Sequence, residues 1–174
     1  MSLIDVEIGA IQRRRRRNKR TNRIDNSREG YIRSLLQQLC PGHVFDKARP
    51  GWNINPETGK RLELDCYAPG LKTARYPNGL AIEVQGYHHY RFCSFRHKSL
   101  ADYEAYQRRD HYTRRNCETH GIRLIGTPDR EHVPDRDIAE WISLKISAHI
   151  KDHVDWLCRG GSDTRGTSAT RRGM

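Results

Sequence analysis

The chain has 174 residues, with 32 Lys and Arg against 21 Asp and Glu and a formal net charge of +11. This length suits one domain with tails, and a hydrophobic content of 35% is low for a chain that is globular throughout. No apolar run is long enough to span a membrane, and the early apolar residues are too few and too divided by acids to form a signal peptide.

The cysteines are odd in number and contain no C-x-x-C pair. This pattern indicates free thiols in a reducing, intracellular compartment. If the host is eukaryotic, the K/R-rich run near the N-terminus makes the nucleus the expected location. The five cysteines are Cys40, Cys66, Cys93, Cys117 and Cys158.

The positive charge is concentrated at the two ends of the chain. Residues 1–28 hold nine Lys and Arg against three acids, and residues 159–174 hold four Arg against one Asp. Like-charge repulsion disfavours packed structure in such segments. We therefore predict a basic flexible arm over residues 1–26, a folded domain over 27–158 and a disordered basic tail over 159–174.

Basic arms usually bind nucleic acid through its phosphates. A solubilising tail and a nuclear-import signal are the alternative interpretations of the arm. An anionic membrane surface is a weaker match, and no membrane partner is expected. The nucleic-acid contacts expected in the arm are Arg13, Arg14, Arg15, Arg16, Arg17, Lys19 and Arg20.

Apolar residues at helical spacing predict a first helix, which opens at residues 26–29 and ends at residues 40–42. Residues 43–46 are predicted to form a short strand, and the Pro, Gly and Asn of residues 47–60 predict a loop. The apolar face of the helix consists of Ile32, Leu35, Leu36 and Leu39.

Two apolar segments, residues 61–67 and 80–86, are predicted to be core strands. The short connection over residues 68–79 favours antiparallel neighbours. An acid interrupts the apolar pattern near the end of each strand, namely Asp65 in the first and Glu83 in the second.

A polar, aromatic-rich loop over residues 87–98 leads to Ser99, which can cap a long helix that runs to about His120 and ends at Gly121. The spacing of its residues predicts one inward-facing stripe, in which an acid lies between aromatic side chains and a thiol. The stripe consists of Leu100, Tyr103, Tyr106, Asp110, Thr113 and Cys117.

Residues 122–126 are predicted to form a third core strand, and a final helix follows Pro134. The order helix, strands, long helix, strand, helix predicts an α/β fold in which helices sandwich a small mixed β-sheet. The buried seam expected on the final helix consists of Ile138, Ile142, Ile146, Ile150, Val154 and Leu157.

Asp65 and Glu83 are the most informative residues of the chain. A buried carboxylate is unfavourable unless a cation or hydrogen bonds compensate its charge. Two acids on neighbouring strands, together with the backbone carbonyl of Val84, offer the oxygen ligands that Mg²⁺ prefers. In so basic a chain, a Mg²⁺ site indicates chemistry on phosphodiesters.

Four segments, read in order, resemble the PD-(D/E)xK nuclease superfamily. They are LELD, LAIEVQGYHHY, RRD on the long helix, and GIRLI. The resemblance covers residues 27–126 and is greatest to the branch of very short patch repair endonucleases and phage homing endonucleases. It implies a restriction-endonuclease-like core over the folded domain and a Mg²⁺ or Mn²⁺ cofactor held by Asp65, Glu83 and Val84.

The resemblance also implies individual roles. Gln85 occupies the Lys position of the E-x-K element, although Gln can neither act as a base nor carry charge. In this branch a His after the motif contributes to catalysis; His88 and His89 both stand there, and we favour His89. The expected catalytic residues are Asp65, Glu83, Gln85, His89, Glu29 and Asp110.

Each assignment has a structural alternative. Asp65 and Glu83 could be a buried pair neutralised by Arg, and Glu29 could close a capping box with Asn26. Asp110 could pair with an Arg in the core, and the two histidines could be surface loop residues. Zinc is not expected, because the chain lacks the Cys-rich spacing of the repair endonucleases.

The sequence therefore predicts a Mg²⁺-dependent DNA endonuclease, with DNA as its partner and a homodimer as a further option. A non-catalytic nucleic-acid-binding protein and a DNA-packaging protein are the rival interpretations, and Gln85 is the main argument for the first of them. The outer face of the long helix is expected to contact phosphates through Arg108, Arg109, Arg114 and Arg115.

Overall fold

The computed structural model describes residues 28–161. The arm over residues 1–26, with all of its predicted nucleic-acid contacts, lies outside the described residues, as does the tail beyond residue 161. The elements are α2 (Arg28–Leu39), β1 (Asp46–Ala48), β2 (Leu64–Ala68), β3 (Leu80–Val84), a 3-10 helix (Tyr87–His89), α3 (Leu100–Thr119), β4 (Arg123–Thr127) and α4 (Ile138–Cys158).

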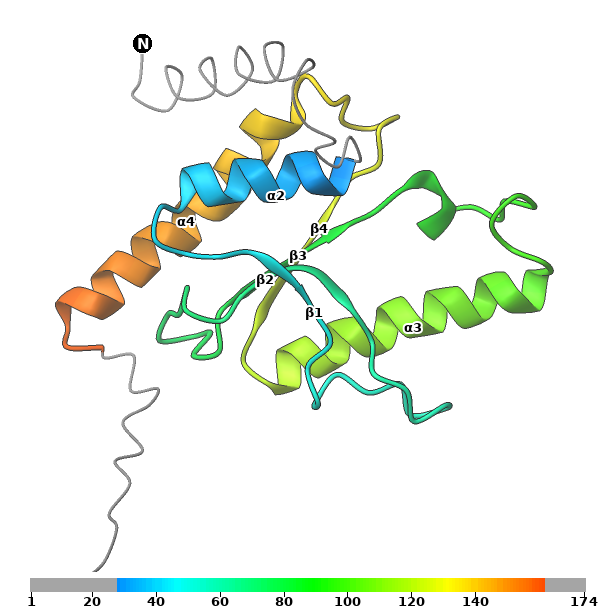
Figure 1. Ribbon diagram of the computed structural model, residues 1–174, viewed down its shortest axis with the longest axis horizontal. Coiled ribbons are helices and arrows are strands. Elements are labelled where there is room, and N and C mark those ends of the chain that lie inside the picture. Colours follow the sequence, from blue (N-terminus) through cyan, green and yellow to red (C-terminus); the bar gives the residue numbers. More distant parts are fainter. Residues whose placement is uncertain (1–27, 162–174) are drawn as a thin grey trace, which may run out of the picture.

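The four strands form one mixed sheet in the order β1-β2-β3-β4 (Figure 1). The first three strands are antiparallel, whereas β4 runs parallel to β3 after the crossover through α3. The antiparallel β2–β3 pair agrees with the short connection between them. At the end of that connection Gly79 has a φ of 101°, and a Cβ there would lie 2.3 Å from the Ala68 carbonyl oxygen, so the turn requires glycine.

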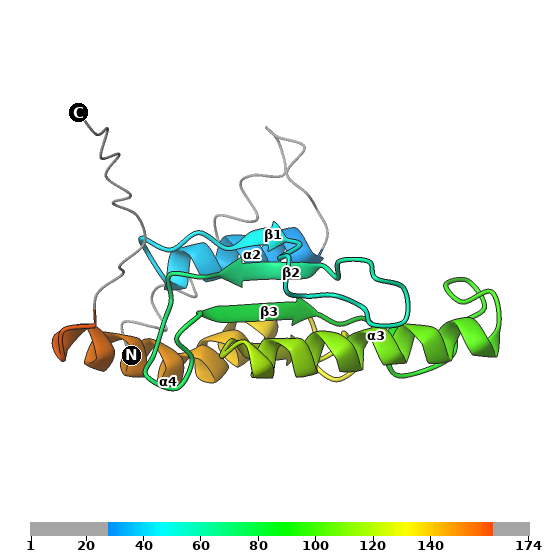
Figure 2. The same cartoon turned by 90° about the horizontal axis from the view of Figure 1, so that it is seen from below.

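Helices cover both faces of the sheet, which confirms the predicted mixed α/β architecture. On one face α2 and α4 enclose the larger core, in which Leu35 and Ile142 pack with Ile82 of β3. On the other face α3 packs through Cys117 against Ala81 in a smaller cluster. Figure 2 shows β1, β2 and β3 in succession, with α3 and α4 beyond β3 on the side where β4 completes the sheet.

The predicted strands have the right order but shifted bounds. The first core strand begins at Leu64 rather than at residue 61, and β3 ends at Val84 rather than at residue 86. Beyond β3, the backbone N–H of Gln85 donates to the Thr127 hydroxyl at 3.2 Å in place of a ladder hydrogen bond. The short strand predicted at residues 43–46 begins only at Asp46.

The long helix α3 begins as predicted, because the Ser99 hydroxyl accepts a hydrogen bond from the Asp102 N–H at 3.2 Å. The predicted inward stripe is wrong at its start, where Leu100 is 61% exposed. The first turns of α3 extend beyond the sheet (Figure 1), so only Thr113 and Cys117 of the stripe are fully buried.

The predicted seam of α4 is also wrong at its end. Val154 and Leu157 are exposed, while His149 and His153 are buried. The loop between β2 and β3 packs against α4 here and presents backbone carbonyls. His149 Nε2 donates to Leu71 O at 2.8 Å, and His153 Nδ1 donates to the next carbonyl at 2.6 Å. Each imidazole donates a hydrogen bond to a loop carbonyl, which an aliphatic side chain at the same position would leave without a partner.

None of the helices within residues 28–161 combines the length and the apolar composition needed to cross a membrane.

Candidate active site

The two predicted metal-binding acids lie side by side on neighbouring strands. Asp65 on β2 and Glu83 on β3 are one position beyond the Cys66–Ile82 pair of the antiparallel register. Asp65 Oδ2 accepts a hydrogen bond from the Val84 N–H at 2.9 Å, so the Asp65 carboxyl group reaches across to β3. Both acids are half-buried on the sheet.

The electrostatics of the pair are unfavourable without a cation. Burial raises the pKa of Asp65, and the hydrogen bond from Val84 opposes this only in part. Burial, followed by the negative charges of Asp65 and Asp110, raises the pKa of Glu83 to about 9. Glu83 Oε1 is buried and has no hydrogen-bond partner among the described residues. Without a cation Glu83 therefore keeps its proton at neutral pH, and its Oε1 makes no hydrogen bond within the described residues.

Among residues 28–161, no arginine forms an ion pair with Asp65 or Glu83. Arg33 Nη2 donates to the backbone carbonyl of Asp65 at 3.0 Å, but its charge pairs with Glu29. Glu29 also pairs with Lys47 at 3.1 Å, so this predicted catalytic acid belongs to an ion-pair cluster on the α2 side of the sheet. The structure does not bring Glu29 into the pocket that holds Glu83. The alternative capping box involves Asn26, which lies outside the described residues.

A pocket of about 300 Å³ lies between β3, α3 and β4. Glu83 and Gln85 both line it, as expected for alternate residues of one strand. Asp110, predicted to be catalytic, and Arg114, predicted to contact phosphate, both line it from α3. The pocket is lined by Glu83, Gln85, Asp110, Thr113, Arg114, Leu124 and Gly126.

Gly126 is a pocket residue that sequence reasoning missed. A Cβ at Gly126 would lie 3.1–3.2 Å from the side-chain amide atoms of Gln85. The missing side chain on β4 therefore leaves room for the Gln85 amide. The spacing of residues 122–126 predicts only a core strand, and the glycine at the end of that strand is the signal for a close approach of another group.

His89, the favoured histidine, is held beside the pocket. Its Nδ1 lies 2.7 Å from Asp110 Oδ2, and its Nε2 lies 3.1 Å from the Tyr106 hydroxyl. The His89 side chain is only 11% exposed. Asp110 thus pairs with a histidine rather than with an arginine, and His89 is not a free surface residue. His88 contacts the same hydroxyl at 3.4 Å.

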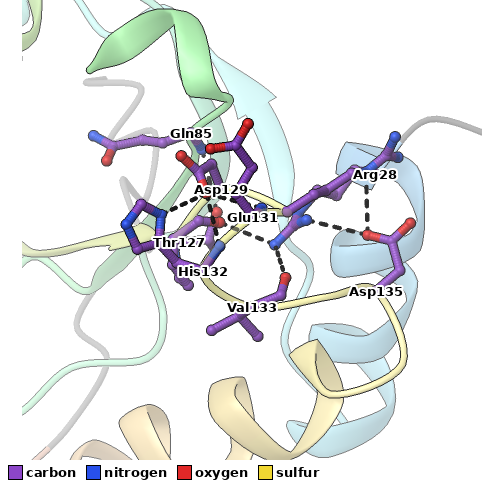
Figure 3. Close-up of polar contacts among 10 residues, drawn as sticks. Arg28, Gln85, Thr127, Asp129, Glu131, His132, Val133 and Asp135 are labelled. Atoms are coloured by element: carbon purple, nitrogen blue, oxygen red, sulfur yellow. Dashed lines mark hydrogen bonds and ion pairs between the residues drawn. The ribbon is translucent and has the colours of Figure 1, made fainter. Parts of the chain in front are cut away.

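Gln85 is positioned from both sides. Its side-chain oxygen accepts a hydrogen bond from the Tyr90 hydroxyl, and its backbone N–H is held by Thr127. Figure 3 shows Gln85 beside Thr127 at the end of β4, and Arg28 of α2 in contact with the loop that follows this strand. Arg28 pairs with Asp135 at 3.1 Å and donates to the carbonyls of Pro128 and Val133. The loop is thereby anchored to the first helix.

The predicted arginine face of α3 is not uniform. Arg108 pairs with Glu57 at 2.8 Å, and the Arg109 guanidinium stacks 4.6 Å from the centre of the Tyr106 ring. Arg114 lines the pocket, and Arg115 is exposed. Of these four arginines, only Arg114 lines the pocket that holds Glu83 and Asp110.

Within residues 28–161, no group of three or more His, Cys, Asp and Glu side chains is arranged to hold a metal ion. The predicted ligand set contains only two such side chains, Asp65 and Glu83, with the carbonyl of Val84 as the third oxygen donor.

No protein-family model and no solved structure matches the chain. The chain is 43% identical over 88 residues to the uncharacterized protein 094L of Frog virus 3, and the match covers 50% of this chain and 52% of that protein. It is 39% identical over 84 residues to the uncharacterized protein 033L of Invertebrate iridescent virus 3 and 39% identical over 89 residues to the uncharacterized protein 307L of Invertebrate iridescent virus 6. These two matches cover 48% of this chain and 40% and 42% of the viral proteins. The chain thus spans about half the length, or less, of these relatives.

Proposed function

We propose that the chain is a divalent-cation-dependent DNA endonuclease of the PD-(D/E)xK type. One observation carries the proposal, namely the uncompensated acid pair of Asp65 and Glu83. Burial and neighbouring acids raise the pKa of Glu83 to about 9, and one of its oxygens is buried without a partner. A bound cation would relieve this arrangement.

The donors suit a hard cation. The Asp65 and Glu83 carboxylates and the Val84 carbonyl are all oxygen ligands, which Mg²⁺ and Mn²⁺ accept. Mg²⁺ commonly binds through one or two carboxylates and retains several waters, so a site without a third acidic side chain is sufficient. When bound, such an ion lowers the pKa of a coordinated water and neutralises charge on the phosphoryl group.

His89 is the group proposed to handle the proton. Its Nδ1 donates to the Asp110 carboxylate, which leaves the Nε2 lone pair as the acceptor. The Tyr106 hydroxyl donates to this Nε2, and the attacking water can take its place as the donor. Asp110 is therefore a positioning residue for the His89 ring.

Two further residues are proposed to hold the phosphate. Arg114 on the pocket wall offers a guanidinium fork that matches two phosphate oxygens. Gln85 offers an amide N–H₂ group, because its carbonyl oxygen is occupied by the Tyr90 hydroxyl. Gln85 can thus orient the phosphate as the lysine of the E-x-K element would, but it carries no positive charge.

The fold supports the restriction-endonuclease-like part of the proposal. The acids lie on adjacent antiparallel strands, a helix precedes the sheet, and α3 crosses over to a parallel fourth strand. Asp110 from that crossover helix meets the same pocket as Glu83.

A non-catalytic nucleic-acid-binding protein is the second candidate, and Gln85 is the observation that favours it. The two candidates differ in what a divalent cation does. An endonuclease cuts DNA in Mg²⁺ or Mn²⁺ and stops in EDTA, whereas a binding protein leaves the DNA intact under both conditions.

The test is a cleavage assay on linear, single-stranded, mismatched and branched DNA in Mg²⁺, Mn²⁺ and EDTA. Glu83→Gln keeps the size of the side chain and removes the charge, and Glu104→Gln on the exposed side of α3 is the matched control. We expect the parent and the control to cut at least one of these DNAs and Glu83→Gln to cut none. Intact DNA with every parent sample would favour the binding protein.

A further inference from the structure

A second hollow runs along the open edge of the sheet, next to the pocket that holds Glu83. We call it the β4 groove. Its volume is about 590 Å³, and it lies along the edge strand β4 where residues of α3 and α4 flank the strand. The groove is lined by Arg75, Tyr76, Arg114, Glu118, Gly121, Ile122, Arg123, Leu124, Ile125, Gly126, Trp141 and Lys145.

The β4 groove is strongly cationic. Arg75, Arg114, Arg123 and Lys145 line it, against the single acid Glu118. Within residues 28–161, none of these four cations forms an ion pair with an acid, although Arg123 donates to the Lys145 carbonyl at 3.2 Å. Their charges are therefore available to an anionic ligand.

Aromatic rings accompany the cations. The Arg75 guanidinium lies 5.4 Å from the centre of the Tyr76 ring, and the Lys145 ammonium lies 5.6 Å from the centre of the Trp141 ring. Cations interleaved with aromatic faces suit a nucleic-acid strand, whose phosphates and bases need both kinds of contact.

The β4 groove is continuous with the proposed active site. Arg114, Leu124 and Gly126 line both hollows. A ligand that lies along β4 would therefore reach the wall that carries Glu83 and Asp110. By contrast, Arg108 on the outer side of α3 already pairs with Glu57.

We infer that the β4 groove binds the phosphodiester backbone of the nucleic-acid strand that enters the pocket of Glu83 and Asp110. The inference rests on the proposed function for the identity of the strand, but the binding it requires needs neither a cation nor catalysis. It moves the main phosphate contacts of the folded domain from the outer face of α3 to Arg75, Arg123 and Lys145.

The test measures the binding of fluorescein-labelled single-stranded and duplex DNA to the full chain by anisotropy in EDTA, over a series of salt concentrations. The groove variant carries Arg75→Glu and Lys145→Glu, both at exposed positions. The matched control carries Lys60→Glu and Lys151→Glu, which reverse two exposed cations that line neither hollow.

We expect the groove variant to bind at least about tenfold more weakly than the control at about 0.1 M salt. Two lost phosphate contacts should also make the log–log salt slope shallower by about 1.8 on duplex DNA or about 1.4 on a single strand. Equal affinities and slopes for the two double variants would overturn the inference.

The same variants separate this inference from the proposed function. Cleavage by the parent with unchanged DNA binding by the groove variant would reject the β4 groove alone. Weakened binding by the groove variant with no cleavage by the parent would retain the groove and reject the endonuclease.

Discussion

At the scale of single residues, Glu83 is distinguished by a raised pKa and by a buried oxygen that has no hydrogen-bond partner among the described residues. A carboxyl group whose pKa burial and neighbouring acids raise to about 9 is protonated at neutral pH unless a cation is bound. The partnerless Oε1 of Glu83 lies at the same place. These two features separate Glu83 from Glu29, whose charge is satisfied by Arg33 and Lys47.

The raised pKa of Glu83 predicts a pH-dependent stability. Between its ordinary value of 4.5 and about 9, the folded state binds a proton that the unfolded state has lost. Stability therefore falls as the pH rises through this window. We expect Glu83→Gln, measured in EDTA, to gain thermal stability relative to the parent as the pH is raised from 5 to 8, by roughly 3–5 °C for each 1 kcal/mol.

Mg²⁺ should reverse this difference, because a cation that binds only the folded parent stabilises it. Differential scanning fluorimetry with and without Mg²⁺ provides the measurement, and Glu104→Gln is the control. If the melting temperatures of the parent and Glu83→Gln changed in parallel with pH, Glu83 would not be an acid whose pKa is raised in the folded state.

His89 provides a second test at this scale. We expect His89→Gln to lower the cleavage rate by about 10²-fold or more, since a positioned general base contributes on this order. DNA affinity should be unchanged, because the ring lies beside Asp110 rather than in the β4 groove. His111→Gln, at an exposed position of α3, is the control. A small effect on the rate would assign proton transfer to another group.

At the scale of elements, the sequence predicts which helices and strands exist better than where they end. Alternating and helical spacing reflect burial, so the order of elements and the antiparallel β2–β3 pair could be predicted. The end of α4 could not, because His149 and His153 are buried by hydrogen bonds to loop carbonyls that lie far away in the sequence. Helical spacing favoured Val154 and Leu157 instead.

The lowered pKa of His149 on α4 predicts acid sensitivity. Burial lowers the pKa of His149, so below about 6.5 the unfolded state takes up a proton that the folded state refuses. Stability is then lost as the pH falls from about 6.5 toward the folded-state pKa. We expect His149→Gln, whose amide can still donate to the Leu71 carbonyl, to lose less stability than the parent between pH 7 and pH 5.

Urea denaturation at the two pH values measures this difference, with His111→Gln as the exposed control. Equal losses for the parent and His149→Gln would assign the acid sensitivity of the fold to other groups.

The candidate site shows the same division between what could and could not be predicted. Asp65 and Glu83 stood out because acids interrupt apolar strands, and their place on adjacent strands followed from the short connection. Local spacing does not specify how α3 crosses the sheet. It therefore could not predict that His89 contacts Asp110 or that Arg114 lines the pocket. Gly126 became informative only beside Gln85.

At the scale of the whole molecule, two groups of cations are proposed to bind DNA, those of the predicted basic arm and those of the β4 groove. Deleting residues 1–25 removes eight Lys and Arg. If most of them contact phosphates, the log–log salt slope of DNA binding should become shallower by several units, at about 0.9 for each contact on duplex DNA. Cleavage at saturating DNA should persist, because no proposed catalytic residue lies in the arm. An unchanged slope would assign the arm to import or solubility.

The central claim, that the Asp65–Glu83 pair performs metal-dependent cleavage, is tested most directly by the single-turnover cleavage rate of Asp65→Asn at saturating DNA. We expect the rate to fall at least about a hundredfold, a loss of ~3 kcal/mol of transition-state stabilisation, while Asp155→Asn at an exposed position of α4 cuts like the parent. The affinity of Asp65→Asn for DNA should be equal or higher, since a negative charge near the phosphate is removed. A parental cleavage rate for Asp65→Asn would contradict the account.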